Sequence, residues 1–249
     1  MSEKLTKSKA KFIKSLQQKK YRDSNKMFVV EGMKLVQEAL QISGVVDFVV
    51  YTGERQDYAF SFPEKAYHTT PIELKSISSL KTPNKILAVC SFPTTLAELD
   101  YKRSILALDE IADPGNLGTI LRLADWFGID QVVCAPGSVD VYNPKVVQAT
   151  MGSIFRVGVF IESLVEVIQK SPDTMNVFIA DMVGENLYEM KVTAPFMLIM
   201  GAEAHGVSPE VRSEAQAVVS IPRFGRGESL NVAISTGIIL SEFKRKLSI

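Results

Sequence analysis

Three glycine-bearing loops of this sequence hold polar side chains that could bind a ligand. Loop glycines let the backbone approach a flat ligand closely. A helix that begins in such a loop also offers unpaired backbone N–H groups. The candidate residues are Asn116 and Arg122 in "DEIADPGNLGTILR", Glu203 in "MGAEAHGVSPE", and Ser229 and Asn231 in "IPRFGRGESLNVAIS".

Each of these side chains also has a purely structural interpretation. Arg122 lies among the apolar residues of "TILRLADWF", where it could instead pair with a carboxylate at a subunit surface. Glu203 could cap a helix, because acidic groups are common near helix N-termini. Ser229 and Asn231 could cap the last helix. The occurrence of three such loops in one chain favours a ligand site over separate structural roles.

The sequence lacks the usual glycine-rich cofactor motifs and metal-binding patterns. A G-x-x-x-x-G-K-[ST] phosphate loop is absent. Gly225 and Gly227 are followed by Leu230, where a dinucleotide fingerprint needs its third glycine, and no G-x-S-x-G elbow of a serine hydrolase occurs. Neither a CxxC pair nor a cluster of histidines and cysteines is present, so no metal is expected.

Apolar strands alternate with helices from Ser104 onward, which predicts an α/β domain with a mainly parallel sheet. Ligands of such sheets bind at the carboxyl ends of the strands, which is where the three loops fall. The expected strands are "SILALDEI", "QVVCAPG", "NVFIADM", "PFMLIMG" and "AVVSI". The expected helix caps are Asn116, Asn143, Ser208 and Asn231, with Pro144 and Pro209 at first helical positions and Gly128 at a helix end.

The first part of the chain is predicted to form a smaller α/β domain, because strands and helices alternate there too. A basic helix is expected over residues 5–20, and another helix begins at Pro71. The polar segment "PTTLAELDYKR" indicates a linker. The predicted organisation is a domain at 1–95, a linker at 96–103 and a domain at 104–249. The expected strands of the first domain are "MFVVEG", "VVDFVVY", "EKAYHTT" and "ILAVCSF".

Charge is unevenly distributed, although the chain is neutral as a whole. Residues 1–26 carry nine lysines and arginines against two acidic residues, which leaves the rest of the chain acidic. Such a basic arm suggests a polyanion partner, although a solvated helix would have the same composition.

The remaining features favour a soluble, cytoplasmic protein without a membrane partner. Cys90 and Cys134 lie far apart in apolar runs and are expected to be buried thiols. The Lys-rich N-terminus lacks the apolar stretch of a signal peptide. No apolar run reaches the ~20 residues needed to span a bilayer.

The three loops resemble, in order and spacing, the signature motifs of the SpoU/TrmH family of RNA 2′-O-ribose methyltransferases. The resemblance covers roughly residues 104–249 and departs from the commonest family form at Ala202 and Ala204, where a small polar residue and a glycine are frequent. A looser resemblance links "KSLQQKKYRDSNKMFVVEGMKLVQEAL" to the family's substrate-binding domain, which is similar to small ribosomal RNA-binding proteins.

The resemblance implies a C-terminal α/β domain with a mainly parallel sheet and a deep trefoil knot, a rare exception to unknotted topology. It also implies a homodimer, in which the last helix packs closely through Ala233, Ser235 and Gly237. The implied cofactor is S-adenosyl-L-methionine, held largely by backbone groups. The residues placed around it are Met200, Gly201, Ile221 and Leu230.

The implied reaction is methyl transfer to a ribose 2′-hydroxyl. Arg122 would act as base or activator, oriented with the ribose by Asn116, Glu203, Ser229 and Asn231. An arginine gives up its proton only with difficulty, so direct phosphate binding is the alternative role for Arg122.

Ribosomal RNA is the preferred substrate, because of the extra N-terminal domain and its basic arm, and transfer RNA is the alternative. Two other interpretations remain: a non-catalytic RNA-binding or ribosome-assembly protein, and an unrelated small-molecule α/β enzyme. The residues expected to contact RNA are Lys9, Lys11, Lys19, Lys20, Arg22, Arg223 and Arg226.

Overall fold

A computed structural model describes residues 3–93, 98–203 and 205–248, and the chain divides into two compact units. The first unit comprises residues 1–94 and 142–155, and the second comprises 95–141 and 156–249. The start of the predicted linker and Ala204 of the second motif lie outside the described residues. Segment 142–155, which the sequence places in the predicted second domain, groups with the first unit.

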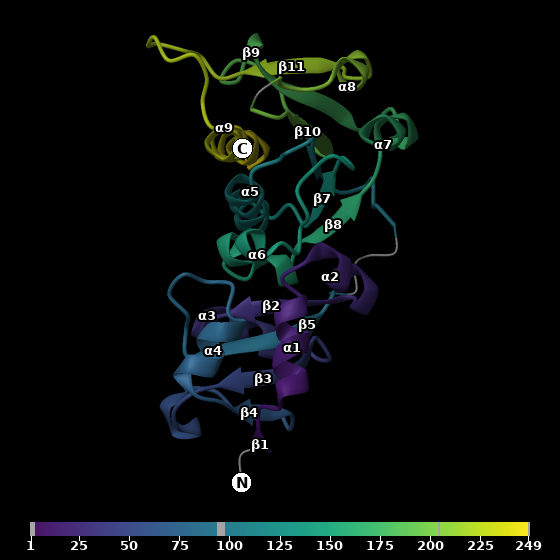
Figure 1. Cartoon of the computed structure of the whole chain (residues 1–249). Helices are drawn as coiled ribbons and strands as arrows, with labels where there is room; N and C mark the ends of the chain where they lie inside the picture. The colour runs from purple at the N-terminus through teal and green to yellow at the C-terminus, as the bar shows by residue number, and fades with distance from the viewer. Residues whose placement is uncertain (1–2, 94–97, 204, 249) are drawn as a thin grey trace. The chain divides into compact units, whose positions relative to one another are not determined.

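The first unit has a five-stranded mixed sheet in the order β1-β4-β3-β5-β2 (Figure 1). β5 runs antiparallel to its neighbours β2 and β3, whereas β1, β4 and β3 are parallel to one another. The four strands expected in this region are all present. The strands are β1 (Glu3–Lys4), β2 (Met27–Glu31), β3 (Val46–Tyr51), β4 (Ala66–His68) and β5 (Ile86–Ser91).

The basic helix expected over residues 5–20 is in fact two helices with a break between them. Leu16 follows the first helix, and Gln18 adopts an extended backbone before the second. The Nη1 of Arg22 donates to the Leu16 carbonyl at 2.8 Å and so satisfies a carbonyl that the break leaves free. The helices of this unit are α1 (Lys7–Ser15), α2 (Lys19–Asn25), α3 (Met33–Leu40), α4 (Pro71–Ile77) and α6 (Pro144–Thr150), with the 3₁₀ turns η1 (Arg55–Asp57) and η2 (Ser153–Phe155).

Segment 142–155 is held to the first unit by aromatic packing. The ring of Tyr142 stacks on Phe92 with 3.8 Å between centroids and also contacts Phe28 at 4.9 Å. Val146 and Val147 on α6 are fully or almost fully buried, and this helix packs against β2. As predicted, Asn143 caps α6 through its side chain, and Pro144 is the first helical residue.

The second unit contains a six-stranded sheet in the order β11-β9-β10-β6-β7-β8, and every strand pair in it is parallel. The predicted parallel sheet is therefore confirmed. The edge strand β8 was not expected from the sequence, because its apolar run is short. The strands are β6 (Ile105–Leu108), β7 (Gln131–Cys134), β8 (Gly158–Ile161), β9 (Asn176–Asn186), β10 (Phe196–Met200) and β11 (Ala217–Ser220).

Helices cover both faces of this sheet. α7, which the sequence did not reveal, and α8 contribute to one apolar cluster with the strands, whereas α5 and α9 pack against each other (Figure 1). Gly128 follows the end of α5 with a φ of +64°, as its predicted position after a helix requires. The helices are α5 (Pro114–Trp126), α7 (Leu164–Lys170), α8 (Pro209–Ser213) and α9 (Val232–Leu247).

Two further expectations concern the cysteines and membrane segments. Cys90 and Cys134 are free and buried, as predicted, and burial raises the pKa of the Cys134 thiol to about 12. Within the described part of the chain, no helix combines the length and the apolar character needed to cross a bilayer.

Candidate functional site

The loops that follow β6 and β10 meet because these strands are neighbours in the middle of the sheet. The strand order reverses at this point, which is where open parallel sheets bind ligands. Asp109, only 3% exposed, directly follows β6 and accepts hydrogen bonds from the backbone N and the Oγ of Ser208 at 2.7 and 2.8 Å. Asp109 therefore fixes the second loop against the first.

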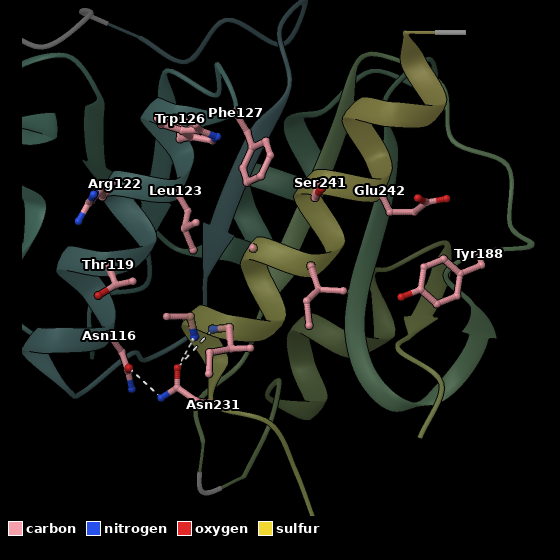
Figure 2. Close-up of a pocket in the computed structure, with 14 residues that line it drawn as sticks. Asn116, Thr119, Arg122, Leu123, Trp126, Phe127, Tyr188, Asn231, Ser241 and Glu242 are labelled. Carbon is pink, nitrogen blue, oxygen red and sulfur yellow. Dashed lines mark hydrogen bonds between the residues drawn. The ribbon is translucent and has the colours of Figure 1, made fainter. Parts of the chain in front are cut away.

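Asn116, Glu203 and Asn231, one residue from each predicted loop, form a hydrogen-bonded group that we call the amide–carboxylate cluster. Asn116 Nδ2 donates to Glu203 Oε1 at 3.0 Å, and Asn231 Nδ2 donates to the same oxygen at 2.8 Å. Asn231 Nδ2 also donates to Asn116 Oδ1 at 2.9 Å (Figure 2). The three loops therefore form one site, as the sequence predicted.

Asn231 is oriented by the helix that it caps. Its Oδ1 accepts from the backbone N of Ala233 at 3.0 Å and of Ile234 at 3.3 Å, so its Nδ2 must face the cluster. The predicted cap is confirmed, and it does not compete with a functional role. One side chain both caps α9 and positions Glu203.

The predicted N-cap of α5 was wrong. Asp113 is the cap, and its Oδ1 accepts from the backbone N of Asn116 at 2.8 Å, while Pro114 occupies the first helical position. Asn116 is therefore the third residue of α5. Since Asp113 caps the helix, the Asn116 amide is free to join the cluster.

Gly201 is required by the shape of the second loop. Ala202 and Gly206 exchange backbone hydrogen bonds of 3.0 and 2.9 Å, which closes the loop tightly. A Cβ on Gly201 would lie 2.2 Å from the carbonyl carbon of Gly206 and 2.3 Å from the N of Val207. A side chain at this position would force the loop open.

The predicted cofactor-contacting residues differ in exposure. Met200 is 2% exposed, and its carbonyl accepts from the Asp109 N at 2.9 Å, so its side chain faces the core. Ile221 is half-buried and Leu230 is 50% exposed. Among the described residues, the backbone groups of 222–230 form no hydrogen bonds with other backbone groups. Apolar side chains beside free backbone groups fit a nucleoside cofactor held mainly by backbone contacts.

Arg122 and Ser229 lie outside the cluster. Arg122 lies on α5 less than two turns beyond Asn116, and its guanidinium points away from Asn231 (Figure 2). It is exposed and has no ion pair or hydrogen bond with a described residue, so no carboxylate in the described part of this chain pairs with it. Ser229 is exposed in the third loop and forms no hydrogen bond within the described residues.

Two cavities flank the cluster. A groove of about 890 Å³ between α5 and α9 is lined by Asn116, Arg122 and Asn231 together with apolar side chains. A smaller cavity of about 330 Å³ between the first two loops is lined by Glu203, Glu110 and His205. Sequence reasoning missed Asp109 and Glu110, although a carboxylate directly after a buried apolar strand was a usable signal.

The basic residues predicted to bind RNA are not equally accessible. Lys11, Lys19 and Lys20 are exposed on α1 and α2. The Lys9 ammonium lies over the Phe48 and Tyr67 rings at 5.0 and 4.6 Å from their centroids. Its charge stays at the surface beside these rings.

Arg22 is a correction to the predicted RNA-binding set. It is 3% exposed, and its guanidinium holds the Leu16 carbonyl at the end of α1, so it supports the fold and cannot reach RNA. Arg223 and Arg226, by contrast, are exposed in the third loop.

Comparison with known proteins finds a matching family model for each of the two parts of the chain. Residues 103–241 match the model of the SpoU rRNA Methylase family, and residues 7–88 match the MRM3-like substrate binding domain. The chain is 32% identical over 235 residues to the 23S rRNA (guanosine(2553)-2′-O)-methyltransferase RlmP of Bacillus subtilis, covering 93% of this chain and 94% of that one. It is 28% identical to the mitochondrial rRNA methyltransferase 3 of Mus musculus, over 92% of this chain and 70% of that one.

Solved structures agree over nearly the whole chain. A TrmH-family protein from Porphyromonas gingivalis has a TM-score of 0.87 at 37% identity, covering 97% of this chain and 99% of that one. An rRNA methyltransferase from Sinorhizobium meliloti with bound AdoMet has a TM-score of 0.86 at 30% identity, covering 98% and 97%.

Proposed function

Because the chain belongs to the SpoU rRNA methylase family, we propose that it transfers a methyl group from S-adenosylmethionine to a ribose 2′-hydroxyl of RNA, with ribosomal RNA preferred over transfer RNA. The single observation that carries the proposal is the amide–carboxylate cluster, which joins one residue from each of the three predicted loops. The rRNA methyltransferases among its relatives support the choice of substrate.

S-adenosylmethionine supplies an electrophilic methyl group on its sulfonium. A ribose hydroxyl is a weak nucleophile, so the protein must position it and remove its proton. In the cluster, Glu203 Oε1 is occupied by two amide donors, whereas Oε2 has no partner among the described residues. We assign Oε2 to accept the hydrogen bond of the 2′-hydroxyl, with Ser229 as a second ligand of the ribose.

Arg122 is assigned to the activation of the substrate. An arginine keeps its charge under ordinary conditions, so it would act as a base only if a nearby sulfonium disfavoured its proton. Its exposure and permanent charge equally suit a bidentate contact to the phosphate of the target nucleotide. Both roles make Arg122 necessary for transfer and dispensable for holding the cofactor.

The cofactor would be held by the tight second loop and by the third loop. Gly201 keeps the second loop closed, and Ile221 and Leu230 provide apolar surface. Backbone groups of 222–230 other than the Gly227 carbonyl provide hydrogen bonds. Met200 would contribute only through its backbone, because its side chain is buried.

We also propose a homodimer formed through the groove between α5 and α9. Trp126 is 81% exposed and Ile234 is 57% exposed beside this groove, whereas Gly237 faces Leu123 of α5 in the same chain. Such apolar exposure is typical of an interaction surface. The family resemblance further supports a trefoil knot in the second unit and an RNA substrate-binding domain at residues 1–95. The bacterial relative RlmP supports a cytoplasmic location.

Transfer of labelled methyl groups to RNA tests the function. The wild-type protein and Arg122→Ala would each be incubated with labelled S-adenosylmethionine and total RNA from cells lacking the protein. We expect label in one RNA size class with the wild type and none with Arg122→Ala. Cofactor affinity, measured by calorimetry, should change less than about tenfold, because Arg122 does not face the cofactor loops.

Each alternative has its own outcome. Cofactor binding without transfer to any RNA would favour a non-catalytic RNA-binding protein. Absence of cofactor binding would favour an unrelated enzyme. An equal loss of cofactor affinity in Arg122→Ala would contradict the role assigned to Arg122.

A further inference from the structure

Phe224 is the most exposed large apolar side chain among the described residues, at 95% exposure. It lies in the third loop, between the end of β11 and the cap of α9. In Figure 1 this segment, in yellow-green, projects away from the rest of its unit. A single exposed apolar side chain is common on protein surfaces, so exposure alone does not assign a role. The residues around Phe224 indicate the role.

The loop around Phe224 has the composition of a nucleic-acid contact. Arg223 and Arg226 flank the ring and are exposed. Arg223 Nη1 donates to the Gly227 carbonyl at 3.3 Å, so its side chain lies across the loop. A Cβ on Gly225 or Gly227 would meet no atom within 4 Å, so none of the described residues packs against these positions. An aromatic ring between two cations is typical of surfaces that bind single strands.

The loop leads directly into the proposed active site. Phe224 precedes Asn231 by seven residues, and a chain of that length reaches at most about 25 Å. Asn231 belongs to the amide–carboxylate cluster. A base stacked on Phe224 would therefore lie within a few nucleotides of the ribose that reacts.

We propose that Phe224 is a stacking platform for an unpaired base of the RNA close to the methylated nucleotide, with Arg223 and Arg226 contacting the adjacent phosphates. This inference rests on the proposed function. Proteins reach RNA bases mainly in unpaired segments, where bases stack on aromatic rings. Phe224 would hold the strand while the cluster receives the 2′-hydroxyl.

Three substitutions separate stacking from other roles of the side chain. Phe224→Ala removes the ring, Phe224→Leu keeps an apolar side chain without a π face, and Phe224→Trp keeps the ring system. Ile161→Ala is the matched control, because Ile161 is 56% exposed on β8, at the opposite edge of the sheet from β11. The fold should survive in all four variants, because the side chains are exposed.

Two RNA probes would be used with each variant. One is total ribosomal RNA from cells lacking the protein, as substrate for labelled methyl transfer. The other is a fluorescent single-stranded oligoribonucleotide of about 12 nucleotides, with its duplex as control. We expect Phe224→Ala and Phe224→Leu to raise the half-saturating concentration of both single-stranded RNA and substrate about 5- to 100-fold. Phe224→Trp and Ile161→Ala should stay within about threefold of the wild type.

Several results would overturn the proposal. If Phe224→Leu binds RNA as tightly as the wild type, the ring acts through simple apolar contact and not through stacking. A loss of cofactor affinity with unchanged RNA binding would assign the ring to the cofactor. A change in oligomeric mass with unchanged RNA binding would assign it to a second copy. Absence of methyl transfer by the wild type would refute the proposed function, and the oligonucleotide would still decide the role of Phe224.

Discussion

Asn231 shows how one residue can have both of the roles that its sequence context allows. A cap on the last helix and a contact in the site are separate interpretations of "ESLNVAIS". The structure combines them, because the oxygen of the amide caps α9 and its nitrogen holds Glu203 and Asn116. A sequence cannot reveal such a combination, since it does not state which way an amide points.

Substitution of Asn231 can separate the two roles. Serine caps helices well but has no amide nitrogen, so Asn231→Ser should keep most of the stability and lose methyl transfer. Asn231→Ala should lose methyl transfer and about 1 kcal/mol of stability as well. Thermal unfolding and initial rates of transfer would be measured on both variants. Full activity in Asn231→Ser would contradict the positioning role of the amide.

At the level of elements, alternation and apolar runs were sufficient to predict the parallel sheet and the loops at its carboxyl ends. They were not sufficient for the edge strand β8, because its sequence "GVFI" is short and closely follows a turn. They also did not reveal α7, the helix that comes after β8. The start of α5 was misplaced by three residues, although Asp113 followed by Pro114 is a better cap signal than Asn116. The separation of Arg122 from the cluster could have been predicted, since six residues of one α-helix turn Arg122 about 120° away from Asn116.

The closed second loop gives a prediction for Gly201. Gly201→Ala would place a Cβ against the backbone of Gly206 and Val207, so the Ala202–Gly206 pair should open. We expect cofactor affinity to fall at least tenfold and methyl transfer to be lost, with the secondary structure retained. Gly158→Ala is the control, because its Cβ would meet only ordinary contacts at 3.4 Å or more. Circular dichroism and calorimetry would measure the two effects, and normal cofactor affinity in Gly201→Ala would refute the explanation.

At the level of the whole molecule, the two units are not consecutive pieces of the chain. A boundary near residue 95 is readable from composition, because a polar segment separates two α/β patterns. The return of segment 142–155 to the first unit is not readable, since its helix has the same amphipathic character as its neighbours. Only the packing of Tyr142 on Phe92 and the burial of Val146 and Val147 reveal it.

Removal of residues 1–97, without segment 142–155, should therefore damage what remains. A fragment of residues 98–249 would expose Val146, Val147 and Phe155, which are buried in the full chain. We expect it to aggregate and to bind the dye ANS more strongly than the full chain does. The same fragment with Val146→Gln and Val147→Gln should be more soluble. If the unmodified fragment is monomeric and binds no dye, α6 does not depend on the first unit.

The return of segment 142–155 also bears on how such a protein can be inherited and recombined. Because the chain enters the first unit twice, an exchange at a single point near residue 95 would transfer only part of that unit. In a hybrid of two relatives, the sheet of the first unit would then come from one parent. Segment 142–155, whose Tyr142, Val146 and Val147 pack in that unit, would come from the other parent. Successful hybrids should carry residues 142–155 together with 1–94, and compensating changes between relatives should be sought across these two segments.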